Sequence, residues 1–542
     1  MSEEIINVIL KKRGIAPENK ADFLNPNYEN QHDPFLLPDM NLAVNRLIKA
    51  KENQEKITVY GDYDVDGVTA SALLLDVLNK LGFKNVNYFL PDRFIDGYGI
   101  SERAVRIIKD RGTDLIVTVD CGSLNHKEIE FANSLGIDVI VTDHHNIAEV
   151  QPDAVAVVNP RRTENKYPNG SSFAGVGVAF KLAQALSLKL EGIENGQEKW
   201  MLDLVALGTV CDIVPMVGEN RQNVFWGLKV LEKTRRPGLK AIMSLAGIEN
   251  ISSSTLGFVL GPRINSAGRL ETAEKALDLV CEKDNFKALD KAKYLETLNK
   301  KRRKIQKEAL EIAIDKAEKM KKDKVLVVAD EDFNDGIIGI VASGLVERFK
   351  KPVFVVSIDG DIAKGSARSF GDFSASKAVH SADEFIIKGG GHDAAAGVTL
   401  KTSQIDNFRK SVNEFYDSLN LKDQIEKLIP SVDMKLQDFS ELNYELYEKI
   451  RQLEPFGPGN EEPIFEFSNA TIVSRQEMGE DKQHIKLTLS DGENQIKMIK
   501  FNAPEEFYLE PGENIDVLFT LGLNEWRGQC SVEGMILHLK RK

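Results

Sequence analysis

The stretch GDYDVDG, residues 61–67, carries three aspartates, Asp62, Asp64 and Asp66, at alternate positions. It follows the short β-branched run ITVY (57–60) and leads into VTASALLLDVLNKLG (68–82), whose apolar residues recur at helical spacing. Carboxylates this close repel one another unless a cation lies among them. The stretch therefore predicts a cation site in the turn between a strand and a helix.

A calcium-binding EF-hand loop also opens with the pattern DxDxDG. A loop of that kind starting at Asp62 would need a bidentate glutamate at its twelfth position, where this chain has Leu73. It would also need a preceding helix, whereas KITVY (56–60) predicts a strand. EF-hand calcium binding is therefore disfavoured.

From residue 57 onward, short β-branched runs alternate with amphipathic helical stretches such as SERAVRIIKDRG (101–112). The runs are ITVY (57–60), VNYFL (86–90), LIVTV (115–119), DVIVT (138–142) and AVAVV (154–158). This alternation predicts an α/β fold in which a parallel sheet is covered by helices on both faces. In such sheets the ligand crevice lies outside the carboxyl ends of the strands, so we expect the site there.

Acidic residues and histidines stand at several of these strand ends. LIVTVDCG (115–122) places Asp120 after one strand, and DVIVTDHH (138–145) places Asp143, His144 and His145 after the next. Asp212 lies within an apolar segment, where an unpaired carboxylate would be costly. A single aspartate at a strand end is usually a helix N-cap, but the repetition of the pattern favours a shared metal site.

The residue types in this group indicate which metal would bind and what it would do. Carboxylate oxygens with an imidazole suit Mn²⁺ or Mg²⁺ better than a closed zinc site, which would need more cysteine and histidine. About six ligands are too many for one ion that must keep open positions. Two ions about 3.5–4 Å apart are the usual arrangement for in-line attack on phosphorus. The sequence therefore predicts two divalent cations, Mn²⁺ or Mg²⁺, in a catalytic site.

Composition limits the class of protein. A chain of 542 residues predicts three or four domains. Its four cysteines are scattered with no CxxC pair, which favours a reducing cytoplasm over a disulfide framework or a structural zinc site. The start lacks a signal-peptide pattern, and no apolar run of about 18 residues predicts a membrane span. With a net charge of −13, nucleic-acid binding would require locally concentrated basic residues.

The rest of the chain divides into three regions. Residues 282–323 contain neither glycine nor proline and predict one or two long helices, in which NKKRRKIQKE (299–308) fits a solvated face. KVLVVAD (324–330) and the segments after it predict a second α/β lobe. The last hundred or so residues contain alternating runs and predict a small all-β barrel of the oligonucleotide-binding (OB) type.

The motifs GDYDVDG, VDCG (119–122) and DHH (143–145), followed by Asp212, resemble the four metal motifs of the DHH phosphoesterase superfamily. Within it, the whole chain is most similar to the bacterial single-strand-specific 5′→3′ DNA exonucleases. Segments typical of these enzymes are FLNP (23–26), DPFLLPDMNLAVNRL (33–47) and PDRFIDGYG (91–99). Small members of the superfamily carry HxxxDxD, which would put histidine at Tyr60; this chain has Asp62 as an added acid.

The resemblance implies a role for each residue of the cluster. The residues that would ligate the metals are Asp64, Asp66, Asp120, His144 and Asp212. Asp62 would be a further ligand or a close partner of one. His145 would contact the scissile phosphate, and Asp143 would orient its neighbours.

The second lobe resembles a DHHA1 domain, whose hallmark here is GGGHDAAAG (389–397). Glycine amides can approach an anionic ligand closely, although such a run is also typical of a tight turn. GSARS (365–369) adds a hydroxyl and a guanidinium that would hold a phosphate. The residues expected to bind substrate in this lobe are Ser366, Arg368, Gly389, Gly390, Gly391 and His392.

Three further segments are candidates for nucleic-acid contact. GPRINSAGRL (261–270) holds Arg263, Asn265 and Arg269, whose guanidiniums suit bidentate phosphate contacts or, alternatively, pairing with acidic residues. Arg93 is a weaker candidate. In the C-terminal barrel, Trp526 is expected in a turn, where it would stack on a base.

One loop departs from the resemblance. The related exonucleases usually carry Trp-His before GVIGI, whereas this chain has Phe333 and Asn334 in DFNDGIIGI (332–340). Contacts made by that histidine would be weaker here or supplied by other residues. The predicted divisions are an N-terminal segment packing on the DHH lobe (1–50), the DHH domain (51–281), a helical connector (282–323), a DHHA1 domain (324–432), and a linker with the OB-fold (433–542).

The resemblance implies a metal-dependent exonuclease that degrades single-stranded DNA 5′→3′ to 5′-mononucleotides in repair and recombination. It also implies a cytoplasmic monomer that works with a helicase and a single-strand-binding protein. One alternative is a phosphodiesterase of short oligoribonucleotides or cyclic dinucleotides, which would not need the β domain or the GPRINSAGRL segment. Another is a non-catalytic nucleic-acid scaffold, which would have lost several of the ligands kept here.

Overall fold

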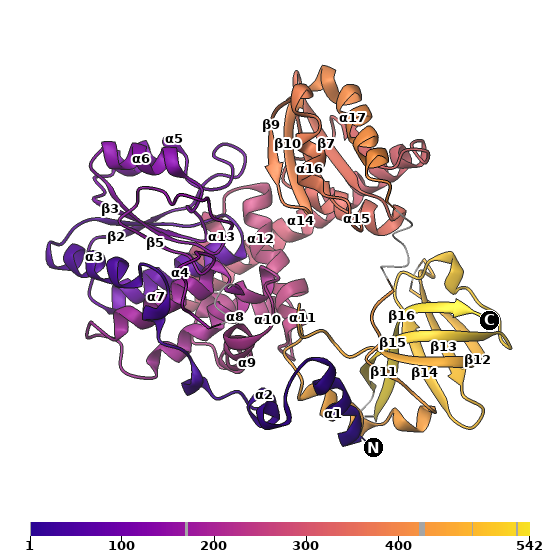
Figure 1. The fold of residues 1–542 in the computed structure, drawn as a ribbon. Helices are drawn as coiled ribbons and strands as arrows, with labels where there is room; N and C mark the ends of the chain where they lie inside the picture. The colour runs from indigo at the N-terminus through magenta and orange to yellow at the C-terminus, as the bar shows by residue number, and fades with distance from the viewer. Residues whose placement is uncertain (1, 169–171, 422–428, 480, 527–528) are drawn as a thin grey trace. The chain divides into compact units, whose positions relative to one another are not determined.

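The computed structural model describes residues 2–168, 172–421, 429–479, 481–526 and 529–542. The chain forms two compact units (Figure 1). The larger comprises Gln31–Val214 and Gly218–Glu426, and the smaller comprises Met1–Asn30, Pro215–Val217 and Lys427–Lys542.

The first lobe of the larger unit is built on a five-stranded sheet in the order β2-β1-β3-β4-β5. Its strands are β1 (Ile57–Tyr60), β2 (Val86–Phe89), β3 (Leu115–Val119), β4 (Asp138–Thr142) and β5 (Ala156–Val158). Every pairing is parallel, so all carboxyl ends lie at one edge. The predicted parallel sheet is confirmed, with all five strands inside the predicted runs.

Helices cover both faces of this sheet (Figure 1). On one face α5 (Glu102–Asp110) and α6 (His126–Ser134) bury apolar residues against β3 and β4. On the other lie α4 (Val65–Lys80) and α7 (Gly175–Ser187), which pack on each other and on the sheet. The other α-helices of the larger unit before the connector are α3 (Met40–Glu52), α8 (Leu202–Cys211), α9 (Gly218–Glu232), α10 (Pro237–Leu245), α11 (Ser253–Thr255), α12 (Gly261–Leu270) and α13 (Glu274–Cys281).

A single long helix, α14 (Asn285–Glu318), joins the two lobes. Asp284 caps it by accepting a hydrogen bond from the Lys287 N–H (2.9 Å). Its first half packs on α10 and α12, and its second half on α15 (Ile338–Phe349) and β6. The connector therefore packs along one side, while Lys300, Lys301, Arg303, Lys304, Lys307 and Glu308 are exposed, in agreement with the solvated face predicted for residues 299–308.

The second lobe contains a mixed sheet in the order β6-β7-β8-β10-β9. Its strands are β6 (Leu326–Asp330), β7 (Val353–Asp359), β8 (Ile362–Arg368), β9 (Ile386–Gly391) and β10 (Ala395–Lys401), with α16 (Ala375–His380) and α17 (Ile405–Ser418). The prediction that residues 389–397 form a glycine-rich loop is wrong for the first three of them. Gly389, Gly390 and Gly391 belong to edge strand β9, because each pairs with a residue of β10.

The smaller unit contains a closed β-barrel. Strands β12 (Phe465–Met478), β13 (His484–Ser490), β14 (Gln495–Lys500), β16 (Gln529–Arg541) and β15 (Asn514–Trp526) follow one another, and β12 pairs with β15 to close the ring. Short strand β11 (Met434–Lys435) and helix α18 (Tyr444–Arg451) precede it. The barrel agrees with the predicted OB-fold.

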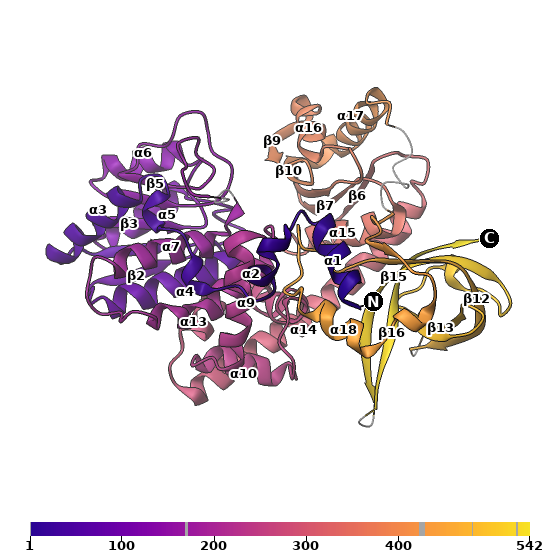
Figure 2. The same cartoon turned by 60° about the horizontal axis from the view of Figure 1, so that its bottom comes forward.

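The expectation that all of residues 1–50 pack on the first lobe is wrong for residues 1–30. Helix α1 (Ser2–Lys12) buries Ile5, Ile6, Ile9 and Leu10 in the same core as the barrel. Figure 2 shows α1 beside α18. The rest of this segment does pack on the first lobe: α3 lies against β5 and α7, and the short helix Pro34–Leu36 lies against α7.

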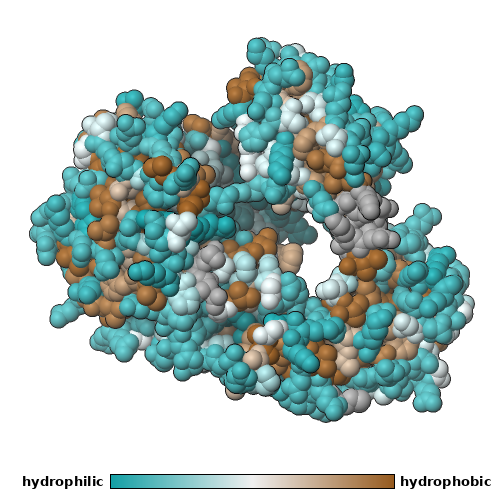
Figure 3. Space-filling model, in the orientation of Figure 1, coloured by the Kyte–Doolittle hydropathy of each residue, from teal (hydrophilic) through white to brown (hydrophobic). Residues whose placement is uncertain are grey.

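Hydrophilic residues predominate on the face drawn in Figure 3, as the charged content of 28% leads one to expect. Among the described residues, no helix is both long and apolar enough to cross a bilayer.

Candidate metal centre and basic pocket

The acidic residues singled out in the sequence meet at the carboxyl edge of the first sheet. Asp62 lies just after β1, Asp120 just after β3, and His144 just after β4. Asp212 joins them from the C-terminal end of α8. Backbone geometry contributes, since Asp120 has φ +65°, an uncommon conformation for an aspartate that is found at functional turns.

Backbone amides hold two of the carboxylates. Asp64 caps α4 by accepting hydrogen bonds from the Asp66 and Gly67 N–H groups (2.9 and 3.1 Å). Asp66 accepts from the N–H groups of Gly175 (2.6 Å) and Val176 (2.8 Å) at the start of α7. Each carboxylate therefore has a fixed orientation and keeps further lone pairs for a cation.

His144 lies at the centre of the cluster. Its Nε2 is 3.1 Å from an Asp120 oxygen, 3.5 Å from an Asp212 oxygen and 3.8 Å from an Asp66 oxygen. His144 Nε2, Asp120 Oδ1 and Asp62 Oδ1 are buried and make no hydrogen bond. Buried polar atoms are almost always paired, so these three atoms indicate that a partner belongs among them.

The electrostatics of the cluster point the same way. Burial, followed by the charge of neighbouring carboxylates, raises the pKa values of Asp62, Asp66, Asp120 and Asp212 above the usual aspartate range. Burial lowers the pKa of His144 to about 3, so this imidazole is neutral and can donate a lone pair. Carboxylates whose charge is this unfavourable fit a site that binds a cation.

His145 differs from His144 in its environment. Asp143 accepts hydrogen bonds from the His144 and His145 N–H groups (2.7 and 3.1 Å) and lies 2.9 Å from His145 Nδ1. The Tyr98 hydroxyl lies 2.8 Å from the same nitrogen. Burial lowers the pKa of His145, but the hydrogen bond and charge of Asp143 raise it to about 9 overall. The ring is 31% exposed and positively charged, which suits contact with a phosphate.

The donors of this cluster fit divalent metal ions. Three overlapping groups have ligand atoms within 4.8 Å of one another: Asp62 with Asp64 and Asp120, Asp66 with His144 and Asp212, and Asp120 with the two histidines. A set dominated by carboxylate oxygen with imidazole suits Mn²⁺ or Mg²⁺. Overlapping groups joined by Asp120 and His144 leave room for two ions.

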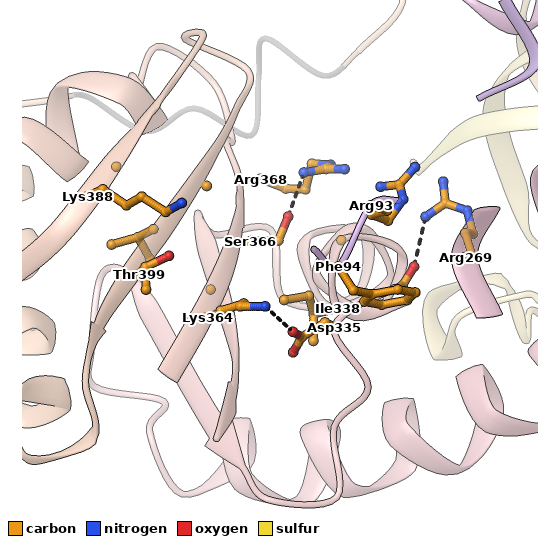
Figure 4. Close-up of a pocket in the computed structure, with 16 residues that line it drawn as sticks. Arg93, Phe94, Arg269, Asp335, Ile338, Lys364, Ser366, Arg368, Lys388 and Thr399 are labelled. Atoms are coloured by element: carbon orange, nitrogen blue, oxygen red, sulfur yellow. Dashed lines mark hydrogen bonds and ion pairs between the residues drawn. The ribbon is translucent and has the colours of Figure 1, made fainter. Parts of the chain in front are cut away.

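A second feature of the larger unit is a cavity of about 520 Å³ lined by both lobes (Figure 4). The first lobe supplies Arg93 and Arg269. The second supplies mainly residues of β8, β9 and β10. The polar and charged lining residues from that lobe are Asp335, Lys364, Ser366, Arg368, Lys388 and Thr399, of which Asp335 pairs with Lys364 (3.0 Å).

The guanidiniums in this cavity are held without carboxylates. Arg93 stacks over the Tyr63 ring, 3.9 Å from its centroid. Arg269 Nη1 donates to the Gly336 carbonyl (3.1 Å), and Arg368 Nη1 donates to Ser366 Oγ (3.2 Å). Among the described residues, none of the three makes an ion pair within 4.0 Å, so the cavity carries uncompensated positive charge suited to phosphate.

Comparison with known proteins is consistent with this geometry. Three family models match the chain: "DHH family, N-terminal domain" over residues 56–209, "DHHA1 domain" over 302–418 and "RecJ OB domain" over 432–538. The single-stranded-DNA-specific exonuclease RecJ of Bacillus subtilis (strain 168) is 37% identical over 540 residues, which is 98% of this chain and 67% of that protein. This chain belongs to the RecJ family.

Solved structures support the assignment. The crystal structure of RecJ in complex with Mn²⁺ from Thermus thermophilus is 28% identical and has a TM-score of 0.84, covering 99% of this chain and 75% of that one. The Mg²⁺ complex of RecJ from the same organism is 27% identical, with a TM-score of 0.77 and coverages of 99% and 74%. Manganese and magnesium therefore both bind RecJ proteins of this fold.

Several residues expected to bind substrate lie elsewhere. Arg263 pairs with Glu296 (2.7 Å) and donates to the Val259 carbonyl (2.7 Å), which is the acidic-partner alternative. Asn265 on α12 and Gly390 do not line the cavity, whereas Gly389 does. Trp526 is the last residue of β15 rather than part of a turn, and its side chain lies outside the described part of the chain.

Two segments of the second lobe, around His392 and around Phe333, are candidates for substrate contact from the sequence. His392 Nδ1 lies 3.2 Å from the side-chain amide nitrogen of Asn146, next to the DHH motif. Phe333, where the resemblance leads one to expect tryptophan, is buried in the lobe's core. Asn334 accepts a hydrogen bond from the Gly336 N–H (2.9 Å), and the Gly336 carbonyl in turn accepts from Arg269.

Sequence reasoning missed several members of both sites. Tyr98 lies in the quoted PDRFIDGYG segment but has no metal-ligating group to mark it. The N–H groups that donate to Asp66 belong to the backbone of GVGVAF (175–180), and only the two glycines of this segment could have indicated such a close approach. Lys364 and Lys388 stand on strands β8 and β9, and only the sheet order brings them to the cavity.

Proposed function

We propose that this protein is a metal-dependent exonuclease that degrades single-stranded DNA from the 5′ end to 5′-mononucleotides. The observation that carries this proposal is the presence, in one unit, of a metal-fitting carboxylate cluster and a cavity of unpaired guanidiniums. The first supplies hydrolytic chemistry, and the second supplies a place for the phosphates of a strand. The named activity of the RecJ relatives supports the same reading.

The metal-binding residues in this proposal are Asp62, Asp64, Asp66, Asp120, His144 and Asp212. When bound, the two divalent ions would supply a water-derived nucleophile and stabilise charge on the phosphoryl oxygens. The protein's own groups act around them. His145, protonated and held by Asp143 and Tyr98, donates a hydrogen bond to the scissile phosphate. Asp143 orients both histidines through its hydrogen bonds with the His144 N–H, the His145 N–H and His145 Nδ1.

The basic cavity binds the phosphate end of the substrate. Arg93, Arg269 and Arg368 converge on it from different elements, and Lys388 extends the positive charge (Figure 4). Guanidiniums and ammoniums of this kind contact phosphate oxygens without reading base sequence. We therefore expect little sequence preference and a strong dependence on salt concentration.

The alternative, a phosphodiesterase of short oligoribonucleotides or cyclic dinucleotides, is not favoured. A substrate of two nucleotides has no use for a separate OB barrel, which is typical of proteins that bind longer single strands. The further parts of the proposal are that the protein works in the cytoplasm in DNA repair and recombination. A helicase that supplies single strands and a single-strand-binding protein are its expected partners.

A comparison of substrates tests the proposal. The protein would be incubated with Mn²⁺ and each of three substrates: a single-stranded DNA of 40 nucleotides, a blunt duplex of the same sequence, and a dinucleotide. Rapid release of mononucleotides from the single strand, with slow reaction of the duplex and the dinucleotide, is expected. Preference for the dinucleotide would support the short-substrate alternative, and equal digestion of the duplex would remove the single-strand specificity.

A further inference from the structure

The packing of α12 on α14 brings arginines of the two helices together in a regular way. Arg263 on α12 pairs with Glu296 on α14 through a 2.7 Å contact. Six residues further along each helix, about 9 Å, stand Arg269 and Arg302. Arg302 lies close to both arginines of α12, because its charge lowers the pKa of Arg269 and the charge of Arg263 lowers its own pKa.

The partners of Arg302 are neutral. Its Nη1 donates to Gln306 Oε1 (2.9 Å) and its Nη2 to Asn299 Oδ1 (2.8 Å), both on the same helix. Its Nε is buried and has no acceptor. Within the described ranges of the chain, Arg302 makes no ion pair. A guanidinium has five N–H donors. The two amides take one each and Nε is buried, so the second N–H of Nη1 and of Nη2 remains for a ligand.

Like charges surround this position. Burial, then the charges of Arg93 and Arg302 and to a smaller extent Arg368, lowers the pKa of Arg269 to about 10, although the charge of Asp64 opposes this shift. Burial, then Arg303 and Arg263, also lowers the pKa of Arg302. Guanidiniums that lie close together without a carboxylate partner repel one another. The chain has 83 acidic and 70 basic residues, so the lack of a carboxylate here does not reflect a shortage of acidic residues. An arrangement of this kind is stabilised by an anion with several charges.

We propose that Arg302 binds a phosphodiester of the DNA strand next to the phosphate held by Arg93, Arg269 and Arg368. This inference rests on the proposed function and extends it by placing the strand along the α12–α14 side of the cavity. Asn299 and Gln306 hold the guanidinium plane in place, so its free N–H groups are preorganised for phosphate oxygens. The connector helix is then a nucleic-acid contact as well as a link between lobes.

The salt dependence of binding tests this contact. Binding of the full-length wild-type and Arg302→Gln proteins to a 5′-phosphorylated, 3′-fluorescent oligothymidine of 20 nucleotides would be measured over a range of KCl concentrations. EDTA would be present to prevent cleavage. Loss of one phosphate contact should weaken binding about tenfold and reduce the slope of log K against log [KCl] by about 0.7. The matched control is Arg303→Gln, which removes the same charge from the adjacent exposed position and should leave the slope unchanged.

Each outcome has a defined meaning. Arg302→Lys keeps the positive charge but loses the planar set of guanidinium N–H donors, so it should retain the slope and weaken binding a few-fold. If Arg302→Gln does not fold, this weaker binding by Arg302→Lys tests the contact instead. A wild-type slope and affinity in Arg302→Gln would overturn the inference, as would equal losses in the Arg302 and Arg303 variants. If the wild-type protein does not bind the strand at all, the proposed function itself fails.

Discussion

At the scale of single residues, the metal centre depends on a glycine that carries no functional group. The Gly175 N–H donates to Asp66 across 2.6 Å. A Cβ at position 175 would lie 2.5–2.7 Å from the Asp120 side chain, closer than real Cβ contacts permit. Glycine at this position therefore lets the start of α7 approach two proposed metal ligands at once.

We predict that Gly175→Ala weakens Mn²⁺ binding at least tenfold and lowers the cleavage rate about 100-fold, because Asp66 and Asp120 must move apart. Isothermal titration with Mn²⁺ and a single-strand cleavage assay measure the two effects. Gly257→Ala is the control, since its Cβ would make an ordinary contact with Val210 at 3.7 Å. Unchanged Mn²⁺ affinity in Gly175→Ala would contradict this role.

Residue types made much of the candidate metal site predictable. Aspartates and histidines after parallel strands must meet at one edge of the sheet, so the chemistry follows from the order of the strands. Arg263 shows the limit of this reasoning. Whether its guanidinium is free depends on its register against Glu296, which is 33 residues away on another helix. No local pattern distinguishes it from Arg269, which does line the cavity.

At the scale of elements, the first helix belongs to the C-terminal barrel. Ile9 of α1 is fully buried in the core that also contains Phe465 and Phe519. The apolar residues of α1 were visible in the sequence, but a helical pattern does not say which core receives them. The assignment to the first lobe failed for this reason.

We predict that Ile9→Ala destabilises the smaller unit by about 2–4 kcal/mol, through lost burial and the cavity left behind. Hydrogen exchange should show faster exchange in β12 and β15 and no change in β1–β4. Val8→Ala, on the same helix but 43% exposed, should change stability by less than about 0.5 kcal/mol. Faster exchange in β1–β4 instead would indicate that α1 supports the first lobe.

A second prediction for the smaller unit concerns pH. Burial, and then the charge of Glu454, raises the pKa of Glu462 to about 7. A folded-state pKa above the unfolded value means that its stabilising contribution is complete below about pH 4.5 and is lost as pH rises through 7. The wild-type protein should therefore lose up to about 3 kcal/mol of stability between pH 5 and 8.5, and Glu462→Gln should not show this loss.

Thermal unfolding at pH 5 and pH 8.5 measures this difference. The exposed Glu493→Gln is a matched control that should keep the wild-type dependence on pH. If Glu462→Gln and the wild type lose the same stability over this range, ionisation of Glu462 is not the cause.

At the scale of the whole molecule, the two lobes of the larger unit meet through the loop that contains Asn334 and Gly336. A Cβ at Gly336 would lie 1.9 Å from the Arg269 carbonyl oxygen. Asn334 holds Gly336, and Gly336 holds Arg269, so this loop positions a cavity arginine from the opposite lobe. Asn334 therefore acts on Arg269 only indirectly, through the backbone of Gly336.

We predict that Gly336→Ala weakens binding of single-stranded DNA at least tenfold, because the lobes must separate to accommodate the methyl group. Mn²⁺ affinity should not change, since the metal residues lie within the first lobe. Gly344→Ala is the control, because its Cβ would meet only the end of the Leu310 side chain, at 3.1 Å. Fluorescence anisotropy with a labelled oligonucleotide measures the effect, and wild-type affinity in Gly336→Ala would contradict it.

The architecture was more predictable than its contacts. Periodicity separated two α/β lobes, a helix and a barrel, because each has its own hydrophobic period. The shared cavity could not be derived that way. It depends on β8 and β9 of one lobe facing Arg93 and Arg269 of the other, and the helix between them spans 34 residues.

The most direct test of the account is a polarity assay on single-stranded DNA labelled at one end or the other, with Mn²⁺ or Mg²⁺. We predict that the 5′ label is released as a mononucleotide while the 3′ label gives a ladder, and that Asp120→Ala abolishes both. Release of a mononucleotide from the 3′ label would contradict the 5′→3′ direction. Activity that survives in Asp120→Ala would contradict the metal centre proposed here.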